Sequence, residues 1–338
     1  MEEVVIENLF NGEREVQVEA ARDLSKLSSK QRQKLAERGV IEPLILMLHS
    51  QDYDAIEAAL FALLSLAFGS ERNKIRIRKS GAIPVLLSLL QCQSESLIEL
   101  TVAALLILSS CTANKLAIAS HGVIQHLVEF LNGDYAGDHN NMNSSISIRA
   151  KLDVIATLHN LSTCHQIIPL IVSSGVPFSL LQQIHNSEKS SELVEKIMGL
   201  LENVVSMSET ALCETASSGG SIRALVETVE DGSPQCKEHA VGILLLICQS
   251  CRERYRGLIL REGVMPGLLQ LSVDGTWRAK NAARELLLLL RDCSSYGSSS
   301  EQPKHELIEQ IMQEIDAGEN VEGTTLRLVE EMIAKLST

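Results

Sequence analysis

The chain has few side chains whose types and spacing could do chemistry. Cys248 and Cys251 form its one C-x-x-C pair, but a zinc site takes about four ligands and no second pair is spaced to complete one. His159, Cys164 and His165 are the densest group of soft ligands. Because His159 falls on a predicted long helix, we interpret it as surface or packing. We expect no metal and no cofactor.

Sequence motifs for common enzymatic reactions are also missing. The sequence has no G-x-x-x-x-G-K-[ST], G-x-S-x-G, H-E-x-x-H or G-x-G-x-x-G. These motifs cradle phosphate, expose a serine nucleophile, hold zinc or bind a dinucleotide. Acidic residues are spread at helix-surface intervals, and no two are placed to act as acid and base. We therefore predict that the protein is not an enzyme.

Two arginine-rich segments stand out in an acidic chain. They are ERNKIRIRKS, residues 71–80, and CRERYRGLILRE, residues 251–262. Clustered guanidinium groups could hold a phosphate or an acidic partner. Ile75 and Ile77 interleave with the charges, however, so a solvated helix face beside a packed one is the better interpretation of both segments.

Composition excludes several classes of protein. The net charge is −13, whereas nucleic acid and anionic membranes are bound by clustered Lys and Arg. No apolar run approaches the ~18 residues of a membrane helix, and the acidic start MEEVVIENLF does not resemble a signal peptide. Eight scattered cysteines are then best interpreted as reduced thiols. We expect no nucleic acid, no membrane, and a cytoplasmic or nuclear location.

The elements that carry these residues repeat along the chain. A glycine followed by an apolar pair (Ser-Ile after Gly220) and a run of apolar residues recurs six times, as in SGAIPVLLSLL from Ser80. The glycines are Gly39, Gly81, Gly122, Gly175, Gly220 and Gly263. Their spacings are 42, 41, 53, 45 and 43 residues, and a period near 42 is typical of a solenoid of short helices. The long interval holds a polar segment, residues 132–147, which we interpret as an inserted loop.

Each repeat is predicted to contain a short, a medium and a long helix. The glycine ends the first helix, and Pro84 and Pro266 fall in the first turn of the second. The third helix is the longest, as in DAIEAALFALLSLA and SLIELTVAALLILSS, with apolar residues at intervals of three and four. The sequence therefore predicts an all-α fold, a right-handed α-solenoid whose stacked repeats share one core.

This layout, with its G-[AV]-I-P…LL corner, resembles the armadillo repeat over residues 1–291, as a partial first repeat and about six more. Residues 263–291 are similar to the closing repeat of plant armadillo proteins related to U-box ubiquitin ligases. That group ends in a Gly-Thr-x-Arg-Ala-Lys stretch, matched here from Gly275 to Lys280. A U-box precedes the repeats in the ligases, whereas this chain starts with a repeat helix, so we expect no U-box.

The resemblance implies that the third helices line a groove for an extended peptide. Import receptors of this fold use a Trp and an Asn, four residues apart, on each third helix. The Trp positions fall at Arg22, Phe61, Ala103, Ala156, Gly199, Gly242 and Arg284. The Asn positions fall at Lys26, Ser65, Ile107, Asn160, Asn203, Leu246 and Leu288. With two of seven Asn and no Trp present, the pattern argues against an import receptor, since each lost amide forfeits about 1 kcal/mol.

Six of these residues are candidates for contact with a partner protein: Asn160, Asn203, Phe61, Arg22, Lys26 and Arg284. Basic residues toward the ends and small or apolar ones in the middle suit a partner helix, or an apolar peptide with acidic flanks. Alternatively, Asn160 and Asn203 bond the backbone of their own repeats. We predict a scaffold that binds other proteins, with a substrate adaptor for a separate ubiquitin ligase as the alternative.

The last part of the sequence differs from the repeats. Residues 292–303 have the composition of a flexible linker. Residues 304–338 contain two amphipathic patterns, HELIEQIMQEI and TLRLVEEMIAKL. They could cover the last repeat or pair with another chain.

Overall fold

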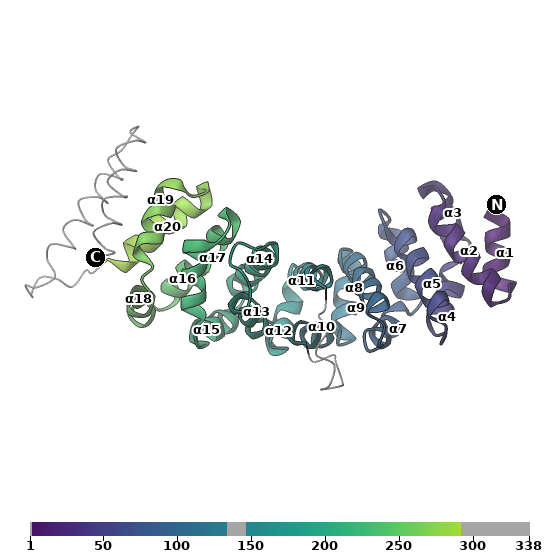
Figure 1. Ribbon diagram of the computed structural model, residues 1–338, viewed down its shortest axis with the longest axis horizontal. Coiled ribbons are helices and arrows are strands. Elements are labelled where there is room, and N and C mark those ends of the chain that lie inside the picture. Colours follow the sequence, from purple (N-terminus) through teal and green to yellow (C-terminus); the bar gives the residue numbers. More distant parts are fainter. Residues whose placement is uncertain (1, 134–146, 292–338) are drawn as a thin grey trace, which may run out of the picture. The chain divides into compact units, whose positions relative to one another are not determined.

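The computed structural model describes residues 2–133 and 147–291. Within these ranges it contains twenty α-helices and one short 3-10 helix, and no β-strand (Figure 1). The all-α prediction is therefore confirmed for the described residues. The linker 292–303, the segment 304–338 and most of the insertion 132–147 lie outside them, and those assignments stay predictions.

The helices form two compact units, Met1–Ser179 and Leu180–Thr338. The first unit opens with α1 (Glu2–Asn11) and α2 (Arg14–Lys26). Three-helix repeats follow: α3 (Ser29–Glu37), α4 (Ile41–Leu48) and α5 (Tyr53–Ala67); α6 (Glu71–Lys79), α7 (Ala82–Leu89) and α8 (Glu95–Ser109); α9 (Thr112–Ser120), α10 (Val123–Asn132) and α11 (Ile148–Ser162). The unit continues with η1 (His165–Ile167) and α12 (Ile168–Ser173), and α13 (Val176–His185) spans the division.

The second unit has the same order of helices. It starts with a third helix, α14 (Glu192–Met207). Two complete repeats follow: α15 (Glu209–Ser217), α16 (Ser221–Asp231) and α17 (Pro234–Ser250); α18 (Arg252–Arg261), α19 (Met265–Asp274) and α20 (Trp277–Leu290). Both units thus contain the predicted three helices per repeat, with the third the longest. The predicted difference between a short first and a medium second helix is wrong in the first unit, where α6 has 9 residues and α7 has 8.

The predicted glycine corners are also confirmed. All six glycines have φ between 76° and 87°, the left-handed region that costs a residue with a Cβ about 1–2 kcal/mol. Gly81, for example, joins α6 to α7 at φ 87°. Pro84 and Pro266 lie in the first turns of α7 and α19, where a missing N–H breaks no helical hydrogen bond.

A polar cap starts each complete third helix. The side chain of Asp52 accepts a backbone N–H at the start of α5. Equivalent caps begin the other long helices: Ser94, Ser147, Ser191, Ser233 and Thr276. Each cap stabilises its helix by about 1 kcal/mol. The polar turn before each long run in the sequence therefore sets the register of the third helix.

The third helices pack side by side within each unit. In the first unit α2 contacts α5, α5 contacts α8, and α8 contacts α11 (Figure 1). In the second, α14 contacts α17 and α17 contacts α20. Buried Leu, Ile, Val and Ala fill the space between them, and Leu60, Leu105 and Leu158 are fully buried. This stacking fixes the rotation of each third helix about its own axis, so the same side of every third helix is packed against its neighbours.

No single helix among the described residues has both the length and the hydropathy needed to cross a membrane. One bent pair, residues 165–173 with Val176–His185, passes that test by length and composition alone, with a bend of 67°.

Candidate partner-binding face

The predicted peptide-contacting positions of the first unit lie on one accessible side of the third helices, which we call the third-helix face. Phe61 on α5 is 47% exposed. Ala103 on α8 and Ala156 on α11 are half-buried, whereas the residues next to them, such as Val102 and Ile155, are almost fully buried. The face is thus a row of small side chains beside one prominent aromatic ring.

The basic residues predicted on this face are paired within their own helix. Arg22 Nη1 lies 3.9 Å from Glu19 Oε2, and Lys26 Nζ lies 2.9 Å from Asp23 Oδ1. The hydrogen bond to Asp23, followed by its charge, raises the pKa of Lys26. Both cations are therefore already balanced on α2, which weakens the predicted preference for a peptide with acidic flanks.

Three carboxylates line the same face and were not singled out from the sequence. Glu57 and Glu99 lie four residues before Phe61 and Ala103, and Asp153 lies three before Ala156. All three are half-buried. Within the described residues, none of these three side chains accepts a hydrogen bond or forms an ion pair. Each third helix from α5 to α11 thus adds one unpaired negative charge to the face.

The pKa of Asp153 shows that its negative charge is disfavoured on this face. Partial burial is the main cause that raises the pKa of its carboxyl, and the nearby Glu99 raises it further, against the opposite effect of Arg149. Desolvation disfavours the charged form of a carboxylate, and a second negative charge does the same. A cation brought to Glu99 and Asp153 would offset both effects, because it favours the charged form of each carboxylate.

Asn160 makes a contact that the sequence did not indicate. Its Nδ2 lies 3.1 Å from Ser109 Oγ and 3.4 Å from the carbonyl oxygen of Leu106. Both partners belong to α8, so the amide links two repeats instead of its own backbone. Ile107 and Ser65, at the equivalent positions, are half-buried on the same face.

Side chains cover two of the equivalent positions in the second unit. An added Cβ on Gly242 of α17 would lie 2.5 Å from Glu202 Oε1. On Gly199 of α14 it would lie 3.4 Å from His239 Nε2. Side chains of neighbouring third helices therefore already occupy the space over both glycines. Asn203, also on α14, is half-buried and has an interaction of its own.

A network of charged side chains crosses this part of the second unit. Glu202 Oε2 lies 2.6 Å from His239 Nδ1, and Glu202 Oε1 accepts a 2.9 Å hydrogen bond from Arg278 Nη2. Arg278 Nη1 also donates to Glu238 Oε1 over 3.0 Å, and the Thr276 hydroxyl donates to Glu238. The network ties α14, α17 and α20 together, and Thr276 and Arg278 both take part in it.

Arg284 does not occupy the position assigned to it. The buried residues of α20, Ala283, Leu286, Leu287 and Leu290, repeat the pattern Ala240, Ile243, Leu244 and Ile247 of α17. In that register Glu285 matches Gly242, and Arg284 matches Val241, which is fully buried in α17. Arg284 is exposed on the side of α20 that faces away from α17. The one-residue difference in the last repeat arises because Thr276 caps α20 one residue later than expected.

Two buried asparagines were missed from the sequence. Asn114 Nδ2 donates to the carbonyl oxygens of Lys74, at 3.0 Å, and Leu108, at 3.2 Å. Asn73, at the equivalent position one repeat earlier, donates to Leu66 O over 2.9 Å. The paired strings SERNK and CTANK were the available signal. Both residues fix the turn between a third helix and the next first helix.

The arginine-rich segments are less solvated than predicted. Lys74 Nζ lies 2.6 Å from Glu71 Oε1 and 2.8 Å from Ser110 Oγ, and Arg78 Nε donates to Asn114 Oδ1 over 2.9 Å. In the second segment Arg252 and Arg256 donate to the last carbonyl groups of α20. The first segment therefore joins its repeat to the next through Arg78 and Asn114, and the second ties α18 to the end of α20 within the last repeat.

The cysteine and histidine candidates form no metal centre in the described residues. Cys248 is buried and Cys251 is exposed, and burial is the main cause that raises the pKa of the Cys248 thiol. No group of three or more His, Cys, Asp or Glu side chains in residues 2–133 and 147–291 could hold a metal ion.

Comparison with known proteins agrees with this geometry. The Armadillo/beta-catenin-like repeat family matches residues 70–110, which contain α6, α7 and α8. U-box domain-containing protein 45 of Arabidopsis thaliana is 30% identical over 282 residues, 81% of this chain and 34% of the relative. U-box domain-containing protein 17 of the same plant is 29% identical over 288 residues, 84% of this chain and 37% of the relative.

Solved structures share the fold. The crystal structure of an engineered protein from the Northeast Structural Genomics Consortium has a TM-score of 0.75 at 20% identity, covering 99% of this chain and 78% of that one. A designed armadillo repeat protein in complex with the peptide (KR)4 has a TM-score of 0.44 at 18% identity, covering 85% and 98%.

The three-helix repeats, their glycine corners and the family match define an armadillo repeat protein. It is related to the plant U-box armadillo proteins, and the alignments lie mainly in the armadillo region. The chain spans 34% and 37% of the length of the two relatives named above.

Proposed function

We propose that this protein binds another protein by holding a segment of it along the third-helix face of the first unit. One observation carries the proposal: Phe61 stands 47% exposed beside carboxylates that form no ion pair and accept no side-chain hydrogen bond among the described residues. An exposed aromatic ring next to small side chains offers an apolar contact. Unpaired carboxylates offer charge for a complementary partner.

The chemistry of the face specifies the segment. An apolar side chain would lie against Phe61 and Ala103, and Lys or Arg side chains would reach Glu99 and Asp153. A guanidinium over the Phe61 ring would add a cation–π contact of about 0.5–1 kcal/mol at an exposed site. This preference differs from the acidic flanks predicted from the sequence, because Arg22 and Lys26 are already paired.

A displayed library of short peptides, screened against the purified full chain, tests the proposal. We expect the bound peptides to be enriched in Lys or Arg next to apolar residues. Phe61→Ala and Glu99→Gln should each weaken them about tenfold, equivalent to about 1.4 kcal/mol. Phe178→Ala, a change at a ring that is 63% exposed on α13, is the matched control. Equal binding to all four proteins would refute the proposal.

The second candidate function is a substrate adaptor for a separate ubiquitin ligase. It is favoured by the relatives, both of which are described as U-box domain-containing proteins. Quantitative mass spectrometry of proteins co-purified with the tagged chain from plant cells separates the two functions. Ubiquitin-ligase components should dominate if the chain is an adaptor. If the chain captures partners through Phe61 and ubiquitin-ligase components are not among them, the protein is a scaffold.

A further inference from the structure

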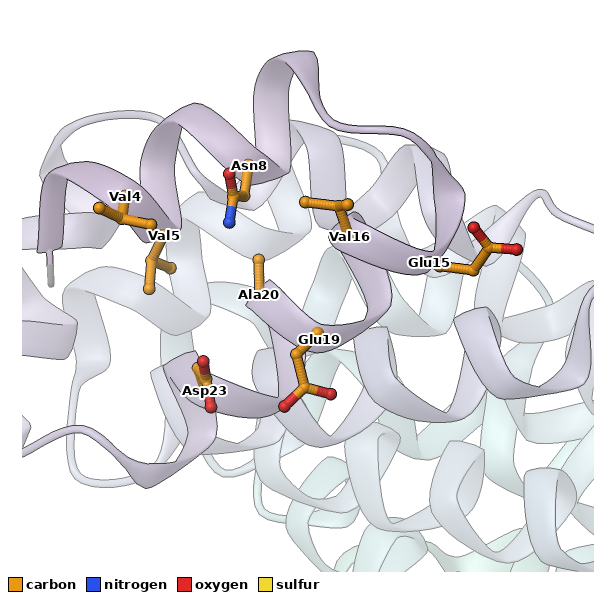
Figure 2. Close-up of a pocket in the computed structure, with 8 residues that line it drawn as sticks. All are labelled: Val4, Val5, Asn8, Glu15, Val16, Glu19, Ala20 and Asp23. Atoms are coloured by element: carbon orange, nitrogen blue, oxygen red, sulfur yellow. The ribbon is translucent and has the colours of Figure 1, made fainter.

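A second surface lies at the start of the first unit, between α1 and α2, and we call it the end pocket. It has a volume of about 610 Å³. Its lining is Val4, Val5, Asn8, Glu15, Val16, Glu19, Ala20 and Asp23 (Figure 2). The first three residues come from α1 and the other five from α2. The end pocket is separate from the row of Phe61, Ala103 and Ala156.

The equivalent position on α5 is filled by a third helix, α2. On α5 the side packed against α2 carries Ala55 and Ala58, each 2% exposed, and Ala62, which is fully buried. The residues at the equivalent places on α2 are Val16, Glu19 and Asp23. No helix among the described residues covers them. The end pocket is therefore a stacking position shaped to receive a helix.

The floor of the pocket is apolar and open. Val4 is 57% exposed and Val16 is 41% exposed, although both sit above Val5 and Ala20, which are 4% and 3% exposed. Val4 and Val16 come from different helices, and Figure 2 shows them on the two sides of the hollow. Apolar side chains inserted between them would remove both from water, which favours binding.

The rim of the pocket is acidic. Glu15, Glu19 and Asp23 stand along α2 (Figure 2). The residues at the equivalent places on α5 are Asp54, Ala58 and Ala62. Arg22 and Lys26 balance Glu19 and Asp23, and Glu15 has no ion pair among the described residues. The rim therefore keeps a net negative charge.

We propose that the end pocket docks an amphipathic helix of a partner protein, with apolar side chains between Val4 and Val16 and Lys or Arg toward Glu15. The shape calls for a helix because a third helix fills the equivalent place on α5. The charge calls for a basic flank because the rim is negative. This inference does not depend on the third-helix face.

Charge also argues against the two nearest alternatives. A second copy would bring another chain with net charge −13 and place one acidic rim against another. The chain's own residues 301–338 have apolar stripes, but they carry nine Asp and Glu against three Lys and Arg. Like charges that face each other across a contact oppose association.

The experiment uses the full chain and a synthetic helical peptide of about 18 residues, which is five turns. The peptide carries Leu along one face and Lys on both flanks. One control peptide has Glu in place of Lys, and a second has the same composition in scrambled order. Binding is followed by fluorescence anisotropy, and the site is located by the methyl resonances of valine-labelled protein. Sedimentation velocity reports the oligomeric state.

The variants separate the end pocket from the rest of the surface. Val16→Arg and Val4→Arg each introduce a repelling charge at a residue that is already partly exposed. Leu116→Arg, at a position 50% exposed on α9, is the matched control, and Phe61→Ala reports on the other face. Circular dichroism melts show which variants keep the fold.

We expect the Lys peptide to bind at least tenfold more tightly than either control peptide and to shift the methyl resonances of Val4 and Val16. Either pocket variant should reduce that binding at least tenfold, while Leu116→Arg and Phe61→Ala leave it unchanged. Binding that survives both pocket variants, or shifts confined to other valines, would overturn the proposal. A dimer that Val16→Arg dissolves would overturn it too, because the occupant would then be a second copy.

Discussion

Glu202 of α14 lies over Gly242 of α17, so close that a Cβ on the glycine would come within 2.5 Å of the carboxylate oxygen. The same carboxylate also contacts His239 and Arg278. Import receptors of the armadillo fold would need a tryptophan at position 242. The second unit instead uses that space for charged groups that hold three third helices together.

Gly242→Ala tests this relationship against Gly199→Ala. Alanine is favoured over glycine inside a helix by about 0.8–1 kcal/mol. At position 199 the new methyl meets His239 at 3.4 Å, an ordinary contact, so we expect a gain of that size. At position 242 the methyl displaces Glu202 from its partners, and we expect a loss of about 1 kcal/mol or more. Urea unfolding measures both.

The Glu202→Ala background supplies the control for this prediction. With the carboxylate removed, Gly242→Ala should recover the stabilisation expected of an unhindered helix position, about 0.5–1 kcal/mol. If Gly242→Ala stabilises the otherwise unchanged protein as much as Gly199→Ala does, Glu202 is not held over the glycine as described.

Asn114→Ala should be among the most destabilising changes in the first unit. The side chain is fully buried, and its loss leaves the carbonyl groups of Lys74 and Leu108 without their donor. We expect a loss of about 2–4 kcal/mol, since each buried group left unsatisfied costs about 1–3 kcal/mol. Hydrogen exchange of α6 and α9 should accelerate with it. Asn281→Ala, an exposed change on α20, should stay within about 0.5 kcal/mol of the unchanged protein.

Asp153→Asn should stabilise the protein at neutral pH. The pKa of Asp153 is raised in the folded state by burial and then by Glu99, so the folded protein binds this proton more tightly than the unfolded chain does. Its contribution to stability is therefore favourable at low pH and is lost as the pH rises from the ordinary Asp pKa through the folded value.

Asparagine removes that pH-dependent penalty. The difference in unfolding free energy between Asp153→Asn and the unchanged protein should be within about 0.5 kcal/mol, as for most surface changes, and positive at pH 7. It should shrink as the pH falls below the ordinary Asp pKa of about 3.9. Denaturant unfolding across this range measures it, and a variant that is less stable at pH 7 contradicts the electrostatic explanation.

The repeat pattern of the sequence was sufficient to predict the helices and their corners. Gly81 needs positive φ because α6 must turn into α7 without a gap, and the spacing of such glycines shows that every repeat makes the same turn. The third helices followed from apolar intervals, and Phe61 and Ala156 lie on the accessible side as that periodicity requires. These features are local, so the sequence records them directly.

The polar contacts between repeats could not be predicted in the same way. Arg278 reaches Glu202 across 76 residues of sequence, and Asn160 reaches Ser109 across 51. Periodicity indicates which side of a helix is buried, but it does not say which polar side chain on the next helix lies opposite. Arg284 shows a related limit, because a single extra residue before α20 moved it off the predicted row.

The central claim is that the third-helix face of the first unit binds a segment of another protein. Hydrogen–deuterium exchange of the full chain, with and without the tightest peptide from the library screen, tests it most directly. We predict slower exchange along α5, α8 and α11, and loss of that protection in Phe61→Ala. Protection confined to α4, α7 and α10, or protection that Phe61→Ala leaves intact, would contradict the claim.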